Sequence, residues 1–209
     1  MVIASDPAVE ASGVDAGFSP RPDTLRAPDV AVLPKDAPPG WIHGVPPLAI
    51  EYADRGQEEE KLAEKIADLL EFGTEVIWVV RLGAIPYVEV HRPQLPVQRV
   101  QGGEELTAPG ILENPIPAEA LWNPIAAQQV TFRNLLNRFG YRDLDEVRLE
   151  GREEGREEGR DALRAAIRAA WAGGGRAPDA VTSTELDALT DRAGLTAELQ
   201  KAITKLSSR

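Results

Sequence analysis

Cysteine is absent from this chain of 209 residues, and histidine occurs only twice. Without thiols there can be no disulfide framework, no thiolate metal site and no cysteine nucleophile. The two isolated histidines, His43 and His91, are more typical of loops and strand surfaces than of a zinc site. Carboxylates are therefore the main candidates for metal ligands in this sequence.

Long apolar runs are also missing. No run approaches the roughly 18 residues that a membrane-spanning helix needs, and the first residues lack the basic end and apolar core of a signal peptide. There is no Gly-x-Ser-x-Gly motif of a serine hydrolase, and Gly173-Gly174-Gly175 lacks the lysine of a phosphate-binding loop. With 43% hydrophobic and 27% charged residues, we expect a globular cytoplasmic protein with no membrane contact.

Positive charge is in short supply. The chain has 23 basic and 34 acidic residues, a formal net charge of -11. Nucleic-acid binding depends on cations that meet phosphates, so the average surface repels DNA. Any binding of DNA would require a local basic cleft.

Proline and glycine divide the chain into three parts. Residues 1–24 show no sustained hydrophobic periodicity and are expected to be a flexible leader. Residues 25–125 alternate short apolar strands with one amphipathic helix, and are expected to form the main domain. Prolines nearly vanish after that point, and residues 126–209 are expected to form a helical tail.

The main domain shows a strand, helix, strand order. Strands are expected at Val30–Leu33, Leu48–Tyr52, Val76–Val80 and Tyr87–His91, and a helix at Gln57–Phe72. A strand–helix–strand unit with short connections implies parallel pairing and a right-handed crossover. The predicted fold class is α/β, a central mixed β-sheet flanked by helices, with a C-terminal α-helical tail.

The tail contains a four-residue repeat, Glu-Gly-Arg-Glu, within a long helix expected at Leu149–Trp171. Four residues are close to one helical turn, so Gly151, Gly155 and Gly159 lie on one face. Each glycine costs about 1 kcal/mol of helix propensity relative to alanine. The pattern suits either a solvated helical spacer or self-association through the glycine stripe.

Three residues in the main domain form a candidate active site. Asp29 begins one strand, Glu51 ends another, and Lys65 lies on the following helix. Two carboxylates can share a divalent cation that activates water and neutralises a phosphate, and an ammonium can stabilise the developing charge. By spacing alone, a turn residue, a surface carboxylate and a helix-face partner of Glu64 or Asp68 explain the same three positions.

Six segments of residues 21–125 follow one another in a fixed order: Arg26–Val32, Gly40–Glu51, Glu64–Lys65 with Leu69–Gly73, Ile77–Val80, Tyr87–Pro93 and Gly103–Pro109. Together they resemble the Uma-type restriction endonucleases, a branch of the PD-(D/E)xK nuclease superfamily. Lys65 follows Glu51 by the usual family spacing of fourteen residues. The Glu-Gly-Arg repeat is also similar to tails found on such proteins.

The resemblance implies a restriction-endonuclease-like core that hydrolyses DNA phosphodiester bonds with Mg²⁺ or Mn²⁺. Asp29 and Glu51 would bind the metal, and both would be catalytic together with Lys65. The superfamily more often places its lysine on the strand, at the position of Ala53 here.

The chain departs from the family pattern at three places. It looks N-terminally shortened, since only the leader precedes Asp29; Ala53-Asp54-Arg55-Gly56 replaces a Ser-Pro-Ser turn; and Arg81 replaces an aspartate. These departures leave two functions open, an active endonuclease and a catalytically inactive nuclease-like scaffold that assembles through its helical tail. A shortened domain would expose one sheet face, so we expect a homo-oligomer (a dimer) or a partner chain that covers the sheet.

Overall fold

The computed structural model describes residues 2–37, 40–53, 59–177 and 179–207. The chain divides into two compact units, Met1–Asp143 (unit 1) and Leu144–Arg209 (unit 2). Each unit is described separately below.

Unit 1 is built on a six-stranded mixed sheet in the order β1-β4-β6-β7-β8-β9. β6 and β7 are parallel, and every other neighbouring pair is antiparallel. The predicted α/β fold class is therefore confirmed. The strands are β1 (Ser12–Val14), β4 (Val30–Val32), β6 (Leu48–Ala53), β7 (Val76–Arg81), β8 (Tyr87–His91) and β9 (Gln98–Gln101).

The crossover between the parallel strands is α2 (Glu59–Glu71). Its buried residues, Ile66 and Leu69, belong to one apolar stripe that packs on the sheet. The helix ends before Gly73, whose φ of 107° is the left-handed conformation that commonly terminates a helix. The helix was predicted to start at Gln57, but residues 57–58 lie outside the described part of the chain.

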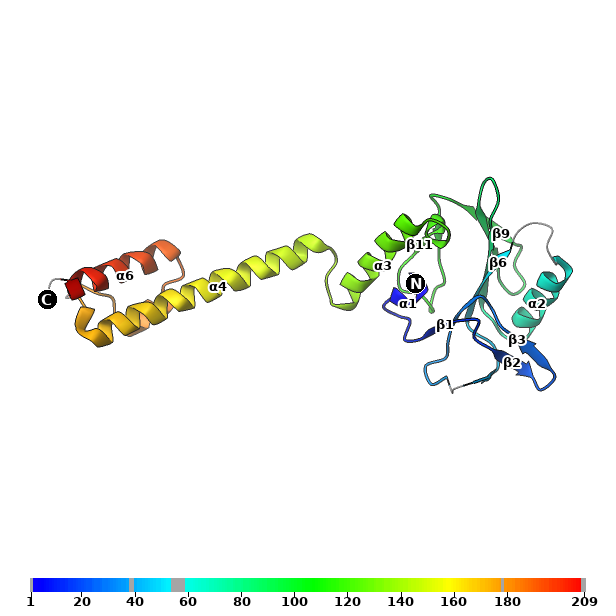
Figure 1. Ribbon diagram of the computed structural model, residues 1–209, viewed down its shortest axis with the longest axis horizontal. Helices are drawn as coiled ribbons and strands as arrows, with labels where there is room; N and C mark the ends of the chain where they lie inside the picture. Colours follow the sequence, from blue (N-terminus) through cyan, green and yellow to red (C-terminus); the bar gives the residue numbers. More distant parts are fainter. Residues whose placement is uncertain (1, 38–39, 54–58, 178, 208–209) are drawn as a thin grey trace. The chain divides into compact units, whose positions relative to one another are not determined.

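Both faces of the sheet are covered. On one face, Ala49, Ile77 and Val79 pack against α2. On the other, Trp78 and its neighbours pack against residues from the N-terminus and from the chain after β9. Figure 1 shows α2 on one side of the sheet and helices α1 (Val2–Ser5) and α3 (Pro124–Arg138) on the other. The expectation of an exposed face that needs a partner chain is not met.

Residues 1–24 differ from the flexible leader that was predicted. They contain α1, β1 and β2 (Phe18–Arg21), and β3 (Thr24–Arg26) begins at their end. β2 pairs with β3 and with β5 (Ile42–His43) in a second, three-stranded sheet. Ile3 and Phe18 are almost fully buried, so tertiary packing fixes a segment in which local periodicity is weak.

The chain after β9 closes the domain. Strands β10 (Glu105–Leu106) and β11 (Ile116–Pro117) pair with each other, and a short 3₁₀ helix, η1 (Ala118–Leu121), follows. The side chain of Asn123 caps α3, with proline at the first helical position.

Helix α3 belongs to unit 1, although the helical pattern placed it in the tail. Its Asn134 side chain donates to Ser5 Oγ, and Arg138 donates to the carbonyls of Ala4, Asp6 and Val9. The boundary between the units therefore falls after Asp143, about 18 residues later than the predicted end of the main domain.

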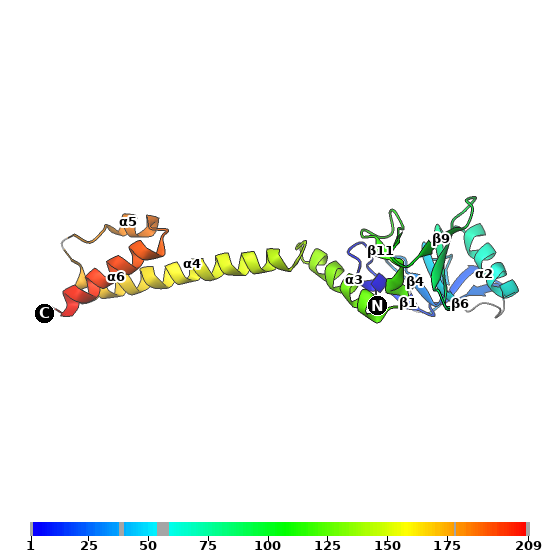
Figure 2. The ribbon, with the colours of Figure 1, turned by 90° about the horizontal axis from the view of Figure 1, so that it is seen from above.

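Unit 2 is helical. It consists of α4 (Leu144–Ala170), the π-helical turn η2 (Trp171–Gly175), α5 (Ser183–Ala188) and α6 (Arg192–Ser207). A small core centres on Ile167 of α4, Leu186 of α5 and Leu195 of α6. Figure 2 shows α5 and α6 beside the C-terminal half of α4 only.

No helix among the described residues combines the length and apolarity needed to cross a bilayer.

Candidate active site

Two strand pairings bring three acidic residues into one row across the sheet. β1 pairs with β4, and β4 pairs with β6, both antiparallel. Continuing each register by one residue places Asp15 opposite Asp29, and Asp29 opposite Glu51. The backbone N–H of Asp15 donates to the carbonyl of Asp29 at 3.2 Å, which supports this alignment. Residues opposite one another share a face of the sheet, so Asp29 and Glu51 lie on one side, and the negative charge of Asp15 also acts on Glu51.

Glu51 faces helix α2. Side chains alternate between the two faces along β6, so Glu51 lies on the same face as Ala49. Ala49 packs on α2. From the helix, Lys65 reaches back so that its Nζ lies 2.6 Å from Glu51 Oε1. The same Nζ donates to the carbonyl of Ala27 at 2.7 Å. The two side chains are only 21% and 7% exposed, so the ion pair is held in a dry environment.

Burial raises the pKa of the Glu51 carboxyl above its ordinary range. Lys65 acts in the opposite direction, and the negative charges of Asp29 and Asp15 raise the pKa further. Within the described chain, no donor makes a well-directed hydrogen bond to the buried Oε1, although the ammonium lies close to it. The Lys65 ammonium is thus the contact that this buried oxygen has, and a metal ion at Glu51 would have to compete with it.

Asp29 is tied to the end of β6. Its Oδ2 accepts a hydrogen bond from the backbone N–H of Tyr52 at 2.6 Å. The Tyr52 hydroxyl, on the opposite face of the strand, donates to the carbonyl of Leu121 at 2.9 Å. The second carboxylate of the site is thus fixed immediately beside Glu51 by a backbone contact.

An ion-pair cluster around the buried Arg81 secures the start of α2. Arg81 at the end of β7 donates to both carboxylate oxygens of Glu59, at 2.8 and 3.0 Å, and to Glu89 on β8 at 3.1 Å. Burial acts to lower the pKa of Arg81, but these two carboxylates hold it above its ordinary value. Arg81 therefore attaches the lysine-bearing helix to the sheet.

His91 lies at the edge of this cluster. Its Nε2 is 3.9 Å from Glu89 Oε2, and burial lowers the pKa of the imidazole. The prediction that His91 lies on a strand is confirmed.

A small basic cleft opens beside Lys65. Its volume is about 330 Å³, and it is lined by Leu25, Arg26, Ala27, Lys61, Glu64 and Lys65. Arg26 is paired with Glu64 and Asp68, so the cleft is not a bare array of cations. It nevertheless collects three basic side chains in a protein whose net charge is -11.

The donor set suits a hard cation with few protein ligands. No group of three His, Cys, Asp or Glu residues suited to a metal ion is found within residues 2–37, 40–53, 59–177 and 179–207. Mg²⁺ commonly keeps several waters and takes only one or two carboxylates together with substrate phosphates. Asp29 and the buried Oε1 of Glu51 fit that requirement.

The structure brings the three predicted site residues together at the same end of strands β4 and β6. Glu51 and Lys65 are in direct contact, and Asp29 lies beside them through its hydrogen bond to Tyr52. Asp15 was missed because residues 1–24 were expected to be flexible. The sequence offers little signal there, because Ser12-Gly13-Val14 is not an apolar run like the one that precedes Glu51.

Comparison with known proteins gives one family and one described structure. The model of the Uma2 family, described as "Putative restriction endonuclease", matches residues 4–117. A crystal structure titled as a putative nuclease belonging to DUF820 from Anabaena variabilis shares 19% identity with a TM-score of 0.48, covering 65% of this chain and 76% of its own. No curated protein matches at a significant level. The family match spans more than half of the chain and includes Asp15, Asp29, Glu51 and Lys65, and the chain therefore belongs to the Uma2 family of restriction-endonuclease-like proteins.

Proposed function

We propose that this protein is a divalent-metal-dependent endodeoxyribonuclease whose catalytic residues are Asp29, Glu51 and Lys65. The observation that carries the proposal is an ammonium 2.6 Å from a buried carboxylate, beside a second carboxylate on the neighbouring strand. Membership of the Uma2 family supports the nuclease class.

Asp29 and Glu51 are the residues that would hold Mg²⁺ or Mn²⁺. When bound, such an ion supplies a Lewis acid and positive charge at the phosphate. Glu51 can serve as a ligand only as a carboxylate, and its contact with Lys65 favours the ionised form against the effect of burial. The tie between Asp29 and the Tyr52 backbone keeps both carboxylates at one point on the sheet.

Lys65 has the reach and the charge for the remaining role. Hydrolysis forms a bond from a water oxygen to phosphorus and breaks one P–O ester bond, and negative charge develops on the phosphoryl oxygens. An ammonium aimed at that charge stabilises the transition state more than the ground state. Arg81, through Glu59, keeps α2 and hence Lys65 in position.

The basic cleft gives the substrate class. Lys61 and Lys65 line it, and Lys65 also contacts Glu51 of the carboxylate row. A phosphodiester backbone is the polyanion that such a cleft fits. Because the net charge of the chain is -11, DNA contact requires a local basic cleft of this kind.

A plasmid-cleavage assay with Mg²⁺ or Mn²⁺ tests the proposal. Lys65→Ala and Asp29→Ala are each expected to lower the rate by about 10²- to 10³-fold, the usual effect of removing one group that stabilises transition-state charge. Lys35→Ala is the matched control, because Lys35 is exposed, pairs with Glu10 and follows the opposite end of β4 from Asp29. Its rate should equal that of the wild type.

Two results would end the nuclease reading. One is wild-type protein that neither cleaves DNA nor binds Mn²⁺ by calorimetry. The other is cleavage that persists at full rate in both the Lys65 and the Asp29 variants, which would point to a contaminating enzyme.

A second function, a nuclease-like scaffold without catalysis, is favoured by one observation. Residues 148–159 of α4 are all exposed and mostly charged, which suits an assembly element. Folded protein with no metal binding, but with self-association through unit 2, would establish this reading in place of the first.

A further inference from the structure

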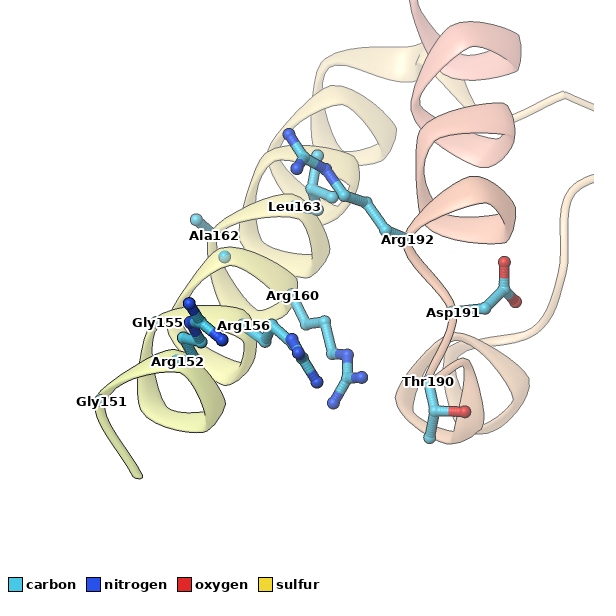
Figure 3. Close-up of a pocket in the computed structure, with 11 residues that line it drawn as sticks. Gly151, Arg152, Gly155, Arg156, Arg160, Ala162, Leu163, Thr190, Asp191 and Arg192 are labelled. Carbon is cyan, nitrogen blue, oxygen red and sulfur yellow. The ribbon is translucent and has the colours of Figure 1, made fainter. Parts of the chain in front are cut away.

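A groove of about 920 Å³ runs along the first half of α4. Its floor and one wall are formed by two rows of residues at four-residue spacing, Gly151, Gly155 and Gly159, and Arg152, Arg156 and Arg160. The segment 190–192 closes one end. Figure 3 shows the side chains of Arg156 and Arg160 reaching into the space between α4 and this segment.

The groove lies next to a packing surface of α4 that is already in use. Leu163 and Ile167 follow Gly159 at the same four-residue spacing, and they pack with Leu195 of α6 in the core of unit 2. Helix α6 starts only at Arg192, at the end of the groove. Every residue from 148 to 159 is exposed. At about 100° per residue, Leu163 and Ile167 point to one side of the glycine row, so α6 covers a neighbouring face of α4 and leaves the glycine face bare.

Nothing within the described chain accounts for the three glycines. A Cβ added at Gly151, Gly155 or Gly159 would meet no atom within 4 Å. At Gly175, by contrast, a Cβ would lie 2.6 Å from the carbonyl oxygen of Ala202. Glycine lowers helix propensity relative to alanine, and here the unit gains no internal contact in return. Close approach by another backbone would explain the stripe.

Charged rows flank the glycine row on both sides. Successive residues are about 100° apart around a helix, so the arginine that follows each glycine lies on one side and the glutamate that precedes it lies on the other. Within the described residues, no ion pair involves Arg152, Arg156 or the three preceding glutamates, Glu150, Glu154 and Glu158. The face thus has a flat centre, a positive edge and a negative edge.

This arrangement distinguishes between orientations of a second copy. If two such helices meet by their glycine rows in parallel orientation, a two-fold axis along the pair places the arginine edge of each beside the glutamate edge of the other. In antiparallel orientation, the two-fold axis is perpendicular and places arginine beside arginine. Only the parallel pair is complementary in charge along both edges.

We propose that this face of α4 is a homodimer interface in which two copies of the helix pair in parallel and in register. The glycine rows form the contact, in the manner of other small-residue helix pairs. Arg156 lies between the heights of the partner's Glu154 and the partner's Glu158, about 3 Å of helix rise from each. Arg152 repeats the pattern one turn earlier, between the heights of the partner's Glu150 and the partner's Glu154, whereas Arg160 already pairs with Glu157 of its own helix.

Charge argues against nucleic acid as the occupant. The segment 144–161 contains eight acidic and four basic residues, so it repels a polyanion as a whole. A second copy carries both kinds of edge and needs no excess of either charge.

Full-length protein provides the first test, by sedimentation velocity. We expect the wild type to dimerise, and the triple variant Gly151→Ala, Gly155→Ala, Gly159→Ala to raise the dimer Kd at least tenfold. Amide exchange in α4 of the monomer should nevertheless slow, because alanine favours the helix. Glu153→Ala, on the far side of α4 from the glycines, is the control and should leave the Kd unchanged. A monomeric wild type, or a triple variant that dimerises as tightly, would overturn the proposal.

Charge exchange provides the second test. Arg152→Glu with Arg156→Glu, and separately Glu154→Arg with Glu158→Arg, should each abolish the homodimer while circular dichroism stays unchanged. An equimolar mixture of the two variants should restore a dimer. Failure of the mixture to associate would remove the charged edges from the interface.

Cross-linking decides the orientation, and the chain has no native cysteine to interfere. In the parallel pair, Gly151→Cys protein and Gly159→Cys protein each cross-link to themselves. In an antiparallel pair centred on Gly155, cross-links would instead join position 151 of one copy to position 159 of the other. That second pattern, read with differently tagged copies, would refute the parallel arrangement.

Discussion

The two units handle charge in opposite ways. In unit 1, Glu51 and Arg81 are buried and Lys65 is partly buried, and each pairs with a residue from another element. In unit 2, the charged rows of α4 are exposed, and the pairs that form are local, such as Arg160 with Glu157 three residues earlier. Buried pairs are costly to dismantle and specify geometry, whereas exposed pairs contribute little. Unit 1 is therefore organised around a fixed site, and unit 2 around a surface.

The largest effect should come from the core of unit 1. Trp78 is fully buried between the strands and the N-terminal helix, and Trp78→Ala should lower the unfolding free energy of unit 1 by about 3–5 kcal/mol. Trp41→Ala is the control, because Trp41 is half exposed and should cost less. Denaturation followed by amide exchange separates the units. Equal loss of protection in α4–α6 would show that the two units do not unfold independently.

The ion pair between Glu51 and Lys65 can be tested for its role, either in catalysis or in the stability of the fold. The double variant Glu51→Gln, Lys65→Met replaces two desolvated charges with neutral groups of similar size. Its unfolding free energy should be unchanged or raised by up to about 4 kcal/mol, while DNA cleavage is lost. The single variant Lys65→Met leaves the carboxylate without its cation and should be less stable than the double. If the double variant were the less stable of the two, the pair would serve the fold rather than the chemistry.

The raised pKa of Glu51 gives a pH dependence with a defined sign. The folded protein holds the Glu51 proton more tightly than the unfolded chain does, so this group's contribution to stability falls as pH rises from the ordinary glutamate value to the raised one. A metal needs the carboxylate form, so Mn²⁺ affinity should fall as pH is lowered through the same window. Lys65→Met should move that midpoint to higher pH, because Lys65 lowers the pKa. Titration calorimetry at a series of pH values measures the Mn²⁺ affinity of the wild type and of Lys65→Met. An unchanged midpoint in the variant would contradict the role of Glu51 as a metal ligand.

The smallest effect is expected in unit 2. Thr182 and Glu185 form a capping box at the start of α5, with Thr182 Oγ1 accepting from the Glu185 N–H at 3.2 Å and the Glu185 carboxylate accepting from the Thr182 N–H at 2.7 Å. Thr182→Ala should cost about 1 kcal/mol, seen as faster amide exchange in α5. Thr196→Ala, inside α6, is the control and should cost less. Unit 1 should be unaffected by either change.

Much of the site could be predicted because it lies on one strand–helix unit. Glu51 ends an apolar strand and Lys65 follows on a helix with clear periodicity, so both the pattern and the spacing are local. Asp15 could not be found in that way, because β1 has only three residues and depends on β4 for its register. The assignment of α3 failed for a related reason. Helical periodicity does not reveal that Arg138 binds carbonyls near the N-terminus, more than a hundred residues earlier.

The contact between Lys65 and Glu51 has a consequence for how the proposed enzyme would respond to its surroundings. The ammonium already occupies the carboxylate that a metal needs, so each binding event must displace a tethered competitor. The apparent metal affinity is then lowered by the fraction of molecules in which Glu51 is free of Lys65. At a low concentration of metal, Lys65 would keep its contact with Glu51 and the site would stay empty. Once the ion binds, the Lys65 ammonium would be free to contact the phosphate.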